Sequence, residues 1–257
     1  SLWGDEASLA INIVTRSFIG LTEPLSYHQA APLGFLFIEK IFTLLFGNSE
    51  YALRLFPLIS GTISLYLIYR ITSKYFGKAG VFAFLMLAIN ASLIFYSSEL
   101  KQYGGDVTIT LLLIYLSLRC LKEDPQIKDF VWLCVVGVIS IWVSHVSVFV
   151  LPGIGLALVL EKFVHKKKLP FTWLLTLGTA WLMAFGINYL VALQYTAADD
   201  FFQFFWSKAF IPLPTQDNFP WFANVYYKFV LIIINRTDVG LAYLILALAL
   251  FGILSLV

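Results

Sequence analysis

Charge is scarce in this sequence of 257 residues, of which only 12% are Asp, Glu, Lys or Arg and 60% are hydrophobic. A soluble globular domain carries about 25% charged and about 45–50% apolar residues. The shortage of charge therefore excludes an ordinary cytosolic enzyme and a disordered chain. The formal net charge of +2 gives no basis for a nucleic-acid partner. The class that remains is an integral, multi-pass membrane protein.

Cysteine and the common catalytic motifs are also nearly absent. The two cysteines, Cys120 and Cys134, lie in or beside apolar runs and are interpreted as buried free thiols, which excludes a disulfide-stapled secreted domain. The sequence contains no Cys/His metal-binding spacing, no Walker loop, no glycine-rich dinucleotide turn and no Gly-x-Ser-x-Gly. Motif spacing thus predicts no metal site and none of these common catalytic families.

Long apolar and aromatic runs are what the sequence does contain. Aromatic residues make up 17% of the chain, as expected for helices that face lipid and carry interfacial belts. A membrane-spanning helix needs about 20 mostly apolar residues. On this criterion we predict an all-α, polytopic bundle with about seven spans, near residues 51–72, 79–96, 105–120, 130–144, 146–160, 171–194 and 239–257.

Two shorter segments before the first predicted span are interpreted as external juxtamembrane helices. Residues 5–18 place apolar side chains between polar ones, and residues 32–46 are interrupted by Glu39 and Lys40. We interpret residues 1–257 as one transmembrane domain. Because the chain begins without Met and ends within an apolar run, we expect it to be a fragment that lacks a first helix and a C-terminal part.

The basic residues are concentrated in three of the connecting loops. Residues 70–78, 119–129 and 161–169 hold ten basic and four acidic residues, whereas the rest of the chain holds seven basic and eleven acidic residues. The positive-inside rule places these three loops in the cytoplasm, where residues 166–168 would contact anionic membrane lipids. The opposite, external side then carries residues 1–50, the turn at residues 97–106, His145 and the long loop at residues 196–238.

Adjacent carboxylates, Asp5 and Glu6, open the first external loop. Acidic residues are favoured in the first turn of a helix, so a purely structural role is one interpretation. The other is a general base or a metal ligand just above the bilayer.

Further polar candidates lie on the same predicted side. Arg54 is within a turn of the start of a span, where it could bind a ligand, extend to the headgroups or pair with Glu50. Lys101 is a candidate anion clamp in a turn that also holds Glu99 and Tyr103, although a solvated loop charge is the alternative. The other candidates are His28, in a polar turn, and His145, which we expect to be neutral.

Four ordered segments carry a family resemblance: Asp5-Glu6, residues 28–34 (HQAAPLG), residues 46–57 (FGNSEYALRLFP) and residues 96–103 (YSSELKQY). Together they resemble the GT-C class of integral-membrane glycosyltransferases, and in particular the superfamily of protein O-mannosyltransferases and lipid A aminoarabinose transferases. Two positions depart from the pattern. Ala31 replaces a proline, and Lys101 replaces an arginine, which keeps the charge but loses bidentate geometry.

The resemblance implies transfer of a sugar from a polyprenyl-phosphate donor to a hydroxyl of a protein, lipid or glycan acceptor. This transfer would take place at the extracytoplasmic face of a membrane, expected to be the bacterial inner or plasma membrane. Asp5 would be the general base, and Glu6 would orient the acceptor or Asp5, or help to hold a cation. Lys101 and Arg54 would bind the donor phosphate, and the substrate-binding residues would be His28, Glu99, Tyr103 and His145. The resemblance requires no cofactor and leaves open whether a divalent cation is bound.

Two other functions are compatible with the sequence. One is a catalytically inactive membrane subunit that binds a lipid-linked sugar without transferring it. The other is a transporter or flippase, for which the predicted spans lack chains of intramembrane acids and bases. Convergence of Asp5, Lys101 and Arg54 in an external cavity would favour sugar transfer, whereas a site at the middle of the membrane would favour transport.

Overall fold

The computed structural model describes residues 2–164, 169–207, 210–212, 215 and 218–234. All regular structure in these ranges is helical, which confirms the predicted all-α class. The chain divides into two compact units, one made of Ser1–Ile89 with Leu93–Phe204 and the other of Asn90–Ser92 with Phe205–Val257. The candidate residues named above all belong to the first unit, which is therefore described in most detail.

The N-terminal helices are α1 (Gly4–Thr15), α2 (Leu33–Phe46) and the short α3 (Glu50–Leu53), with the 3-10 turns η1 (Gly20–Thr22) and η2 (Ser26–His28) between α1 and α2. At the carboxyl end of α1, the Lys40 ammonium of α2 donates hydrogen bonds to the carbonyls of Ile13 and Val14, at 3.0 and 2.9 Å. These carbonyls have no partner within the helix, and a cation there also complements the helix dipole. Lys40 thereby fixes α1 on α2.

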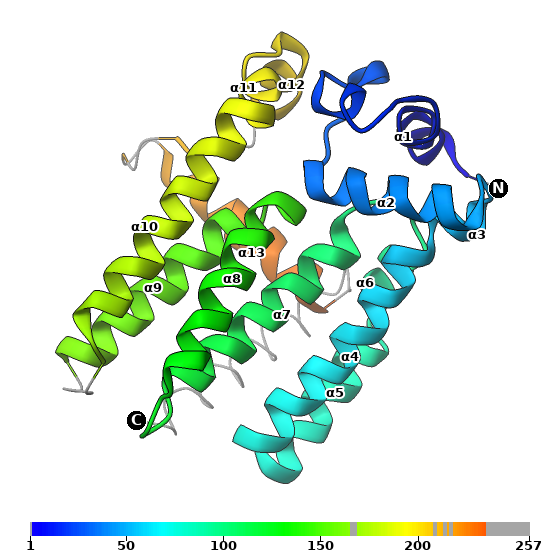
Figure 1. Ribbon diagram of the computed structural model, residues 1–257. Helices are drawn as coiled ribbons and strands as arrows, with labels where there is room; N and C mark the ends of the chain where they lie inside the picture. Colours follow the sequence, from blue (N-terminus) through cyan, green and yellow to red (C-terminus); the bar gives the residue numbers. More distant parts are fainter. Residues whose placement is uncertain (1, 165–168, 208–209, 213–214, 216–217, 235–257) are drawn as a thin grey trace. The chain divides into compact units, whose positions relative to one another are not determined.

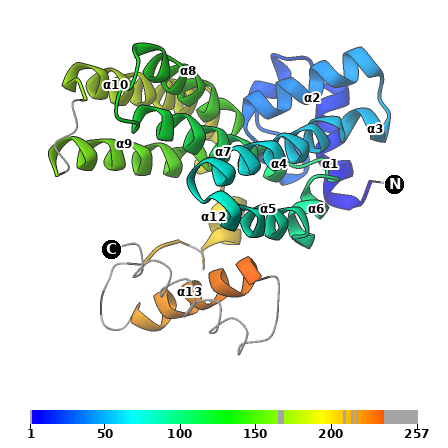
Figure 2. The ribbon, with the colours of Figure 1, turned by 90° about the horizontal axis from the view of Figure 1, so that it is seen from below.

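A bundle of helices follows, shown in Figures 1 and 2, with α7 lying between α4 and α8 in both views. Its members are α4 (Leu55–Tyr75), α5 (Gly80–Ala88), α6 (Ala91–Tyr96), α7 (Tyr103–Cys120), α8 (Ile127–Val143), α9 (Ser147–Phe163) and α10 (Phe171–Asn188). The last helix continues through a π-helical turn, Tyr189–Leu193, into α11 (Gln194–Ala197), and α12 (Asp200–Trp206) follows.

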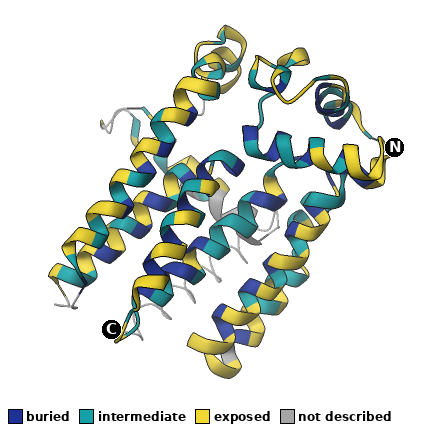
Figure 3. Cartoon of the chain, viewed as in Figure 1, coloured by how far each residue is buried: buried dark blue, intermediate teal, exposed yellow. Residues whose placement is uncertain are grey.

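Two buried clusters hold the first unit together. One joins α7, α8, α9 and α10 around Leu133 and Leu158, and the other joins α1 and α2 to Leu100 in the turn before α7. Helix α2 approaches α8 so closely that a Cβ atom at Gly34 would lie 2.8 Å from the Trp142 carbonyl oxygen. Figure 3 shows exposed residues along the outer faces of α4, α5 and α10, as expected for helices whose apolar side chains face lipid.

Only part of the predicted span count is supported. By length and composition, the helical segments Leu55–Tyr75 and Phe171–Ala197 satisfy the requirements for crossing a membrane. The predicted span at residues 79–96 is broken between α5 and α6 at Asn90, a residue type that favours the start of a helix over its interior. The predicted span at 239–257 lies outside the described residues, so a total of seven spans stays a prediction.

The described part of the predicted long loop at residues 196–238 contains the helices α12 and, in the second unit, α13 (Phe219–Ile234). The turns after α4 and after α7, which the sequence predicts to be cytoplasmic, lie at the ends of the helices opposite to α1 (Figure 1). Residues 166–168 of the third basic loop lie outside the described residues. The predicted sorting of the basic turns away from the candidate residues is therefore reproduced by the fold.

Candidate active site

Asp5, Gln29 and Lys101 form a closed ring of contacts between α1, the turn after η2 and the turn before α7. The Lys101 ammonium lies 2.7 Å from Asp5 Oδ2 and donates a hydrogen bond to Gln29 Oε1 at 3.1 Å. Gln29 Nε2 in turn donates to Asp5 Oδ1 at 2.9 Å. Residues that are 96 positions apart in the chain are thus brought into direct contact, which the sequence predicted only as a shared side of the membrane.

The Asp5 carboxylate is charged but still accessible. Burial favours the neutral acid, but hydrogen bonds from Lys101 and Gln29 outweigh it and hold the pKa of Asp5 below its ordinary value. Its side chain keeps 43% of its surface exposed, whereas that of Lys101 keeps only 10%. Asp5 is therefore an ionised carboxylate that another molecule could reach.

Glu6, the neighbour of Asp5, has a different environment. Its side chain is fully buried and accepts four hydrogen bonds, from Arg54 Nε at 3.1 Å, Arg54 Nη2 at 2.6 Å, the Leu100 amide at 2.7 Å and the Trp3 amide at 3.3 Å. Although burial opposes ionisation, these donors hold the pKa of Glu6 below its ordinary value. Glu6 thus ties α1 to the α3–α4 junction and to the turn that carries Lys101.

Glu99 is close enough to interact electrostatically with Glu6 and Lys101, and Tyr103 with Asp5. Glu99 accepts a hydrogen bond from the indole Nε1 of Trp3 at 2.7 Å, and burial raises its pKa. The Tyr103 ring meets that of Tyr96 edge to face, with ring centroids 4.8 Å apart. Both predicted residues therefore lie beside the Asp5–Lys101 pair, Glu99 as a support for the first residues of the chain and Tyr103 in an aromatic pair.

His28 lies in a turn whose backbone is strained. Tyr27 and His28 have positive φ angles of 64° and 49°, a region that side-chain-bearing residues rarely adopt. The His28 ring stacks on Phe201 of α12, with ring centroids 4.1 Å apart. Because Gln29 is the next residue, this stack helps to set the position of the amide that bridges Asp5 and Lys101.

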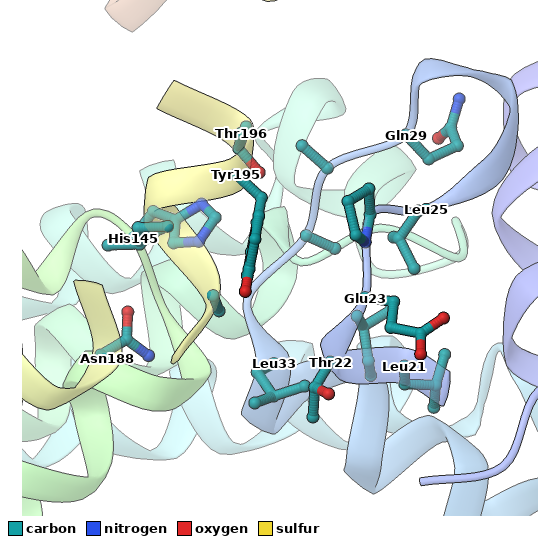
Figure 4. Close-up of a pocket in the computed structure, with 16 residues that line it drawn as sticks. Leu21, Thr22, Glu23, Leu25, Gln29, Leu33, His145, Asn188, Tyr195 and Thr196 are labelled. Carbon is teal, nitrogen blue, oxygen red and sulfur yellow. The ribbon is translucent and has the colours of Figure 1, made fainter. Parts of the chain in front are cut away.

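A pocket of about 40 Å³ lies beside Gln29, between the first loop and the end of α10. Figure 4 shows His145 and Asn188 on one side of it and Gln29 and Glu23 on the other, with the Tyr195 ring between them. Burial lowers the pKa of His145, so its ring is neutral at pH 7, in agreement with the sequence-based expectation. The pocket therefore brings His145, a residue predicted from the sequence, close to Gln29, which is hydrogen-bonded to Asp5.

Arg54 and Lys101 have different carboxylate partners. The sequence predicted that both cations would bind the donor phosphate, but Arg54 is paired with Glu6 through two hydrogen bonds. A bidentate arginine–carboxylate pair is among the strongest hydrogen-bonded arrangements in proteins. In this structure, only Lys101 of the two predicted phosphate ligands contacts Asp5.

Sequence reasoning missed Gln29, Trp3 and Asn188. Gln29 lies in a motif that carried the family resemblance, but no role was assigned to it. Asn188 is a buried amide in an otherwise apolar segment, and a polar residue in such a segment is itself a signal of function. No three His, Cys, Asp or Glu side chains gather into a metal-binding group in the described part of the chain.

The sequence profile of the family of dolichyl-phosphate-mannose-protein mannosyltransferases matches residues 30–198, which is more than half of the sequence. This chain belongs to that family. The match confirms the GT-C resemblance that the four motifs indicated, and it includes Arg54 and Lys101. It starts after Asp5 and Glu6, whose roles therefore depend on the geometry described above.

The fold is similar to that of a solved membrane protein, ArnT from Cupriavidus metallidurans in the apo state. The two share 17% sequence identity with a TM-score of 0.56, over 78% of this chain and 39% of ArnT. The chain thus spans about two-fifths of the length of ArnT. No curated protein matches the sequence significantly.

Proposed function

We propose that this chain is the catalytic part of a membrane glycosyltransferase. It would transfer a sugar from a polyprenyl phosphate to an acceptor hydroxyl at the extracytoplasmic face. The observation that carries the proposal is the accessible Asp5 carboxylate held 2.7 Å from the Lys101 ammonium. Such a pair supplies a base for the acceptor and a cation for the departing phosphate, the two charges that this reaction requires.

Asp5 is the general base of the proposed reaction. The acceptor oxygen attacks the anomeric carbon of the donor sugar, and the bond between this carbon and the phosphate oxygen breaks. The acceptor proton passes to the Asp5 carboxylate, and the electron pair of the broken bond leaves with the polyprenyl phosphate. A carboxylate with a lowered pKa stays ionised at neutral pH and is available to take up this proton.

Lys101 stabilises the negative charge that develops on the leaving phosphate. In the substrate-free arrangement its ammonium is engaged by Asp5 and by Gln29 Oε1. A phosphate oxygen that binds Lys101 replaces the Asp5 carboxylate as the partner of this cation. Donor binding thereby frees Asp5 for the acceptor, which couples the two halves of the reaction.

Glu6 and Arg54 act as positioning residues in this proposal. Glu6 is fully buried and its four acceptor positions are occupied, so it is not accessible to a substrate. Its hydrogen bonds to Arg54 and to the Leu100 amide hold α1 against the turn before α7. Asp5 precedes Glu6 in the chain and Lys101 follows Leu100, so these bonds help to fix both residues. We assign Arg54 this role in place of the phosphate contact that the sequence predicted.

The same geometry favours transfer over transport. The candidate residues gather at the end of the bundle that carries α1, and transport would instead require a site midway along the helices. An inactive subunit that binds a lipid-linked sugar would keep the phosphate contact of Lys101 but have no use for an accessible base. The exposed Asp5 carboxylate thus supports the enzymatic function.

Replacement of Asp5 by Asn in the full-length protein tests the proposal. The variant keeps the size of the side chain and removes the base, so we expect transfer from a polyprenyl-phosphoryl sugar to fall by about 10²–10⁴-fold. Asp124→Asn is the matched control, since Asp124 is exposed in the turn after α7. Transfer by D5N at the wild-type rate would exclude Asp5 as the base. Donor binding without any transfer by the wild-type protein would support the inactive subunit.

A further inference from the structure

The pocket beside Gln29 is lined by a buried side-chain amide, that of Asn188. Asn188, at the end of α10, is 2% exposed, and its Oδ1 has no hydrogen-bond partner in the part of the chain that the structure describes. Asn188 lines the pocket together with His145 and Gln29 (Figure 4). A buried acceptor without a partner is costly, so its retention indicates a donor that enters from outside the chain.

The backbone next to Asn188 is also unusual. The five residues that follow it, Tyr189–Leu193, form a π-helical turn in an otherwise α-helical segment. Such turns are rare and occur frequently at functional sites, because the wider turn changes which side chains face a given direction. Ala192, Leu193, Tyr195 and Thr196, from this turn and the helix after it, all line the pocket.

The polar groups that line the pocket among its apolar side chains are uncharged, apart from one carboxylate. Asn188, Thr196 and Tyr195 are neutral, and burial keeps the His145 ring neutral as well. The carboxylate in the lining, Glu23, belongs to an exposed residue. The neutral groups suit hydroxyls, which both donate and accept hydrogen bonds, and the lining contains no Lys or Arg that could pair with a phosphate.

The volume limits how much of a ligand can enter. About 40 Å³ exceeds the roughly 10–15 Å³ that one water molecule requires but is far below the volume of a whole ligand site, roughly 300 Å³ or more. Two or three hydroxyl-sized groups fit this space, which corresponds to one edge of a sugar ring.

We propose that this pocket binds the hydroxyl edge of an uncharged sugar, with Asn188 Oδ1 accepting a hydrogen bond from one sugar hydroxyl. The proposal rests on the sugar transfer proposed above and adds the substrate class: a neutral, hydroxylated sugar. Gln29 lies between the two parts of the site. It contacts Lys101, the proposed phosphate ligand, and it also lines the pocket for the sugar hydroxyls.

A binding experiment on the full-length protein in lipid nanodiscs tests this assignment. The probes are polyprenyl-phosphoryl mannose and the same polyprenyl phosphate without a sugar. Replacement of Asn188 by Leu removes the acceptor, and we expect about 5- to 30-fold weaker binding of the sugar-bearing lipid. Binding of the bare lipid should change by less than about twofold, because the phosphate contacts lie outside the pocket.

Two further variants complete the design. Thr196→Val also removes a polar group from the pocket lining and should weaken sugar-dependent binding to a smaller extent. It serves as the test if N188L does not fold. Thr179→Val is the matched control, because Thr179 is exposed on α10, the helix that carries Asn188, and its hydroxyl donates to backbone carbonyls of α10. It should bind both lipids as the wild-type protein does.

The sugar that enters the pocket could belong to the donor or to a glycan acceptor. Weaker binding of the sugar-bearing lipid by N188L identifies the donor sugar. An unchanged donor affinity with a raised KM for a glycan acceptor identifies the acceptor. If neither quantity changes in N188L and T196V while the wild-type protein still transfers sugar, the pocket assignment is wrong and the proposed function stands. If the wild-type protein transfers no sugar, the proposed function fails first.

Discussion

Two carboxylates at opposite ends of the bundle are each held by lysine, but only one of them is accessible. Asp129, at the start of α8, is fully buried between Arg119 and Lys122, with nitrogen–oxygen distances of 2.7 Å to both cations. Asp5 shares Lys101 with the Gln29 amide and keeps 43% of its side chain exposed. Ion pairing alone therefore does not identify the candidate site. The candidate site is identified by a carboxylate that is both charged and accessible from outside the protein.

Glu6 belongs with Asp129 in this comparison, although it is next to Asp5 in the chain. Both Glu6 and Asp129 are fully buried, and each also accepts a hydrogen bond from a backbone amide. Such saturated carboxylates connect segments of the chain. The adjacent residues Asp5 and Glu6 thus have different roles because α1 points one into the protein and leaves the other at its surface.

The largest expected effect is on the free energy of unfolding, which distinguishes a structural carboxylate from a catalytic one. We expect Glu6→Gln and Asp129→Asn to destabilise the folded protein by about 2–4 kcal/mol each, because each substitution replaces a fully buried acceptor oxygen by an amide NH2 that faces hydrogen-bond donors. Asp5→Asn should cost less, about 1 kcal/mol, since the Asp5 side chain is 43% exposed and the asparagine oxygen can still accept a hydrogen bond from Lys101. Thermal unfolding of the three variants in the same detergent measures the difference. A loss of stability in D5N as large as that in E6Q would make Asp5 a structural residue.

The second prediction compares the two lysines. Lys101→Met should lower transfer by about 10²-fold, because it removes the charge that stabilises the leaving phosphate. It should also shift the acid limb of the pH–rate profile to higher pH, since loss of the Lys101 cation raises the pKa of Asp5. Lys122→Met, at the other end of the bundle, should leave the rate per folded molecule and the pH profile unchanged.

Lys101→Arg distinguishes charge from position in this test. It keeps the cation and should recover part of the transfer rate and the original acid limb. If K101M shows the wild-type profile, Lys101 does not control the ionisation of Asp5, and the proposed coupling between donor binding and release of the base is wrong.

The sequence predicted much of this arrangement, for identifiable physical reasons. Apolar runs indicated the helical class, and the bias of basic residues correctly separated the turns after α4 and α7 from the end that carries Asp5. The family motifs pointed to Asp5 and Lys101, which lie in contact. These signals depend on composition and local order, which a single sequence contains.

The partners of each charge were not predictable in the same way. The pairing of Arg54 with Glu6, 48 positions away, was not among the partners that the sequence suggested. Asn188 and Gln29 meet at one pocket only because α10 ends beside the first loop. Which carboxylate faces a cation and which faces solvent is decided by how helices pack against one another. One sequence read without its fold does not specify that packing.

The smallest expected effect concerns a third kind of buried carboxylate, Glu39 of α2. It is fully buried like Glu6, but neither of its oxygens has a hydrogen-bond partner in the described part of the chain. Burial without a cation raises its pKa well above the ordinary value of 4.5, so the acid is held in its neutral form. We expect Glu39→Met, which replaces it with an apolar side chain of similar length, to stabilise the protein by about 1–2 kcal/mol near pH 8.

The pH dependence of this gain follows from the direction of the pKa shift. A group whose pKa is raised by folding favours the folded state fully below its unfolded pKa, and that contribution is lost as the pH rises through the folded pKa. The wild-type protein should therefore lose stability as the pH rises above the ordinary value of 4.5, and E39M should lose less. Glu123→Met, at an exposed position, is the control. An equal pH dependence in wild-type protein and E39M would mean that folding does not raise the pKa of Glu39, which would contradict a neutral, unpaired side chain.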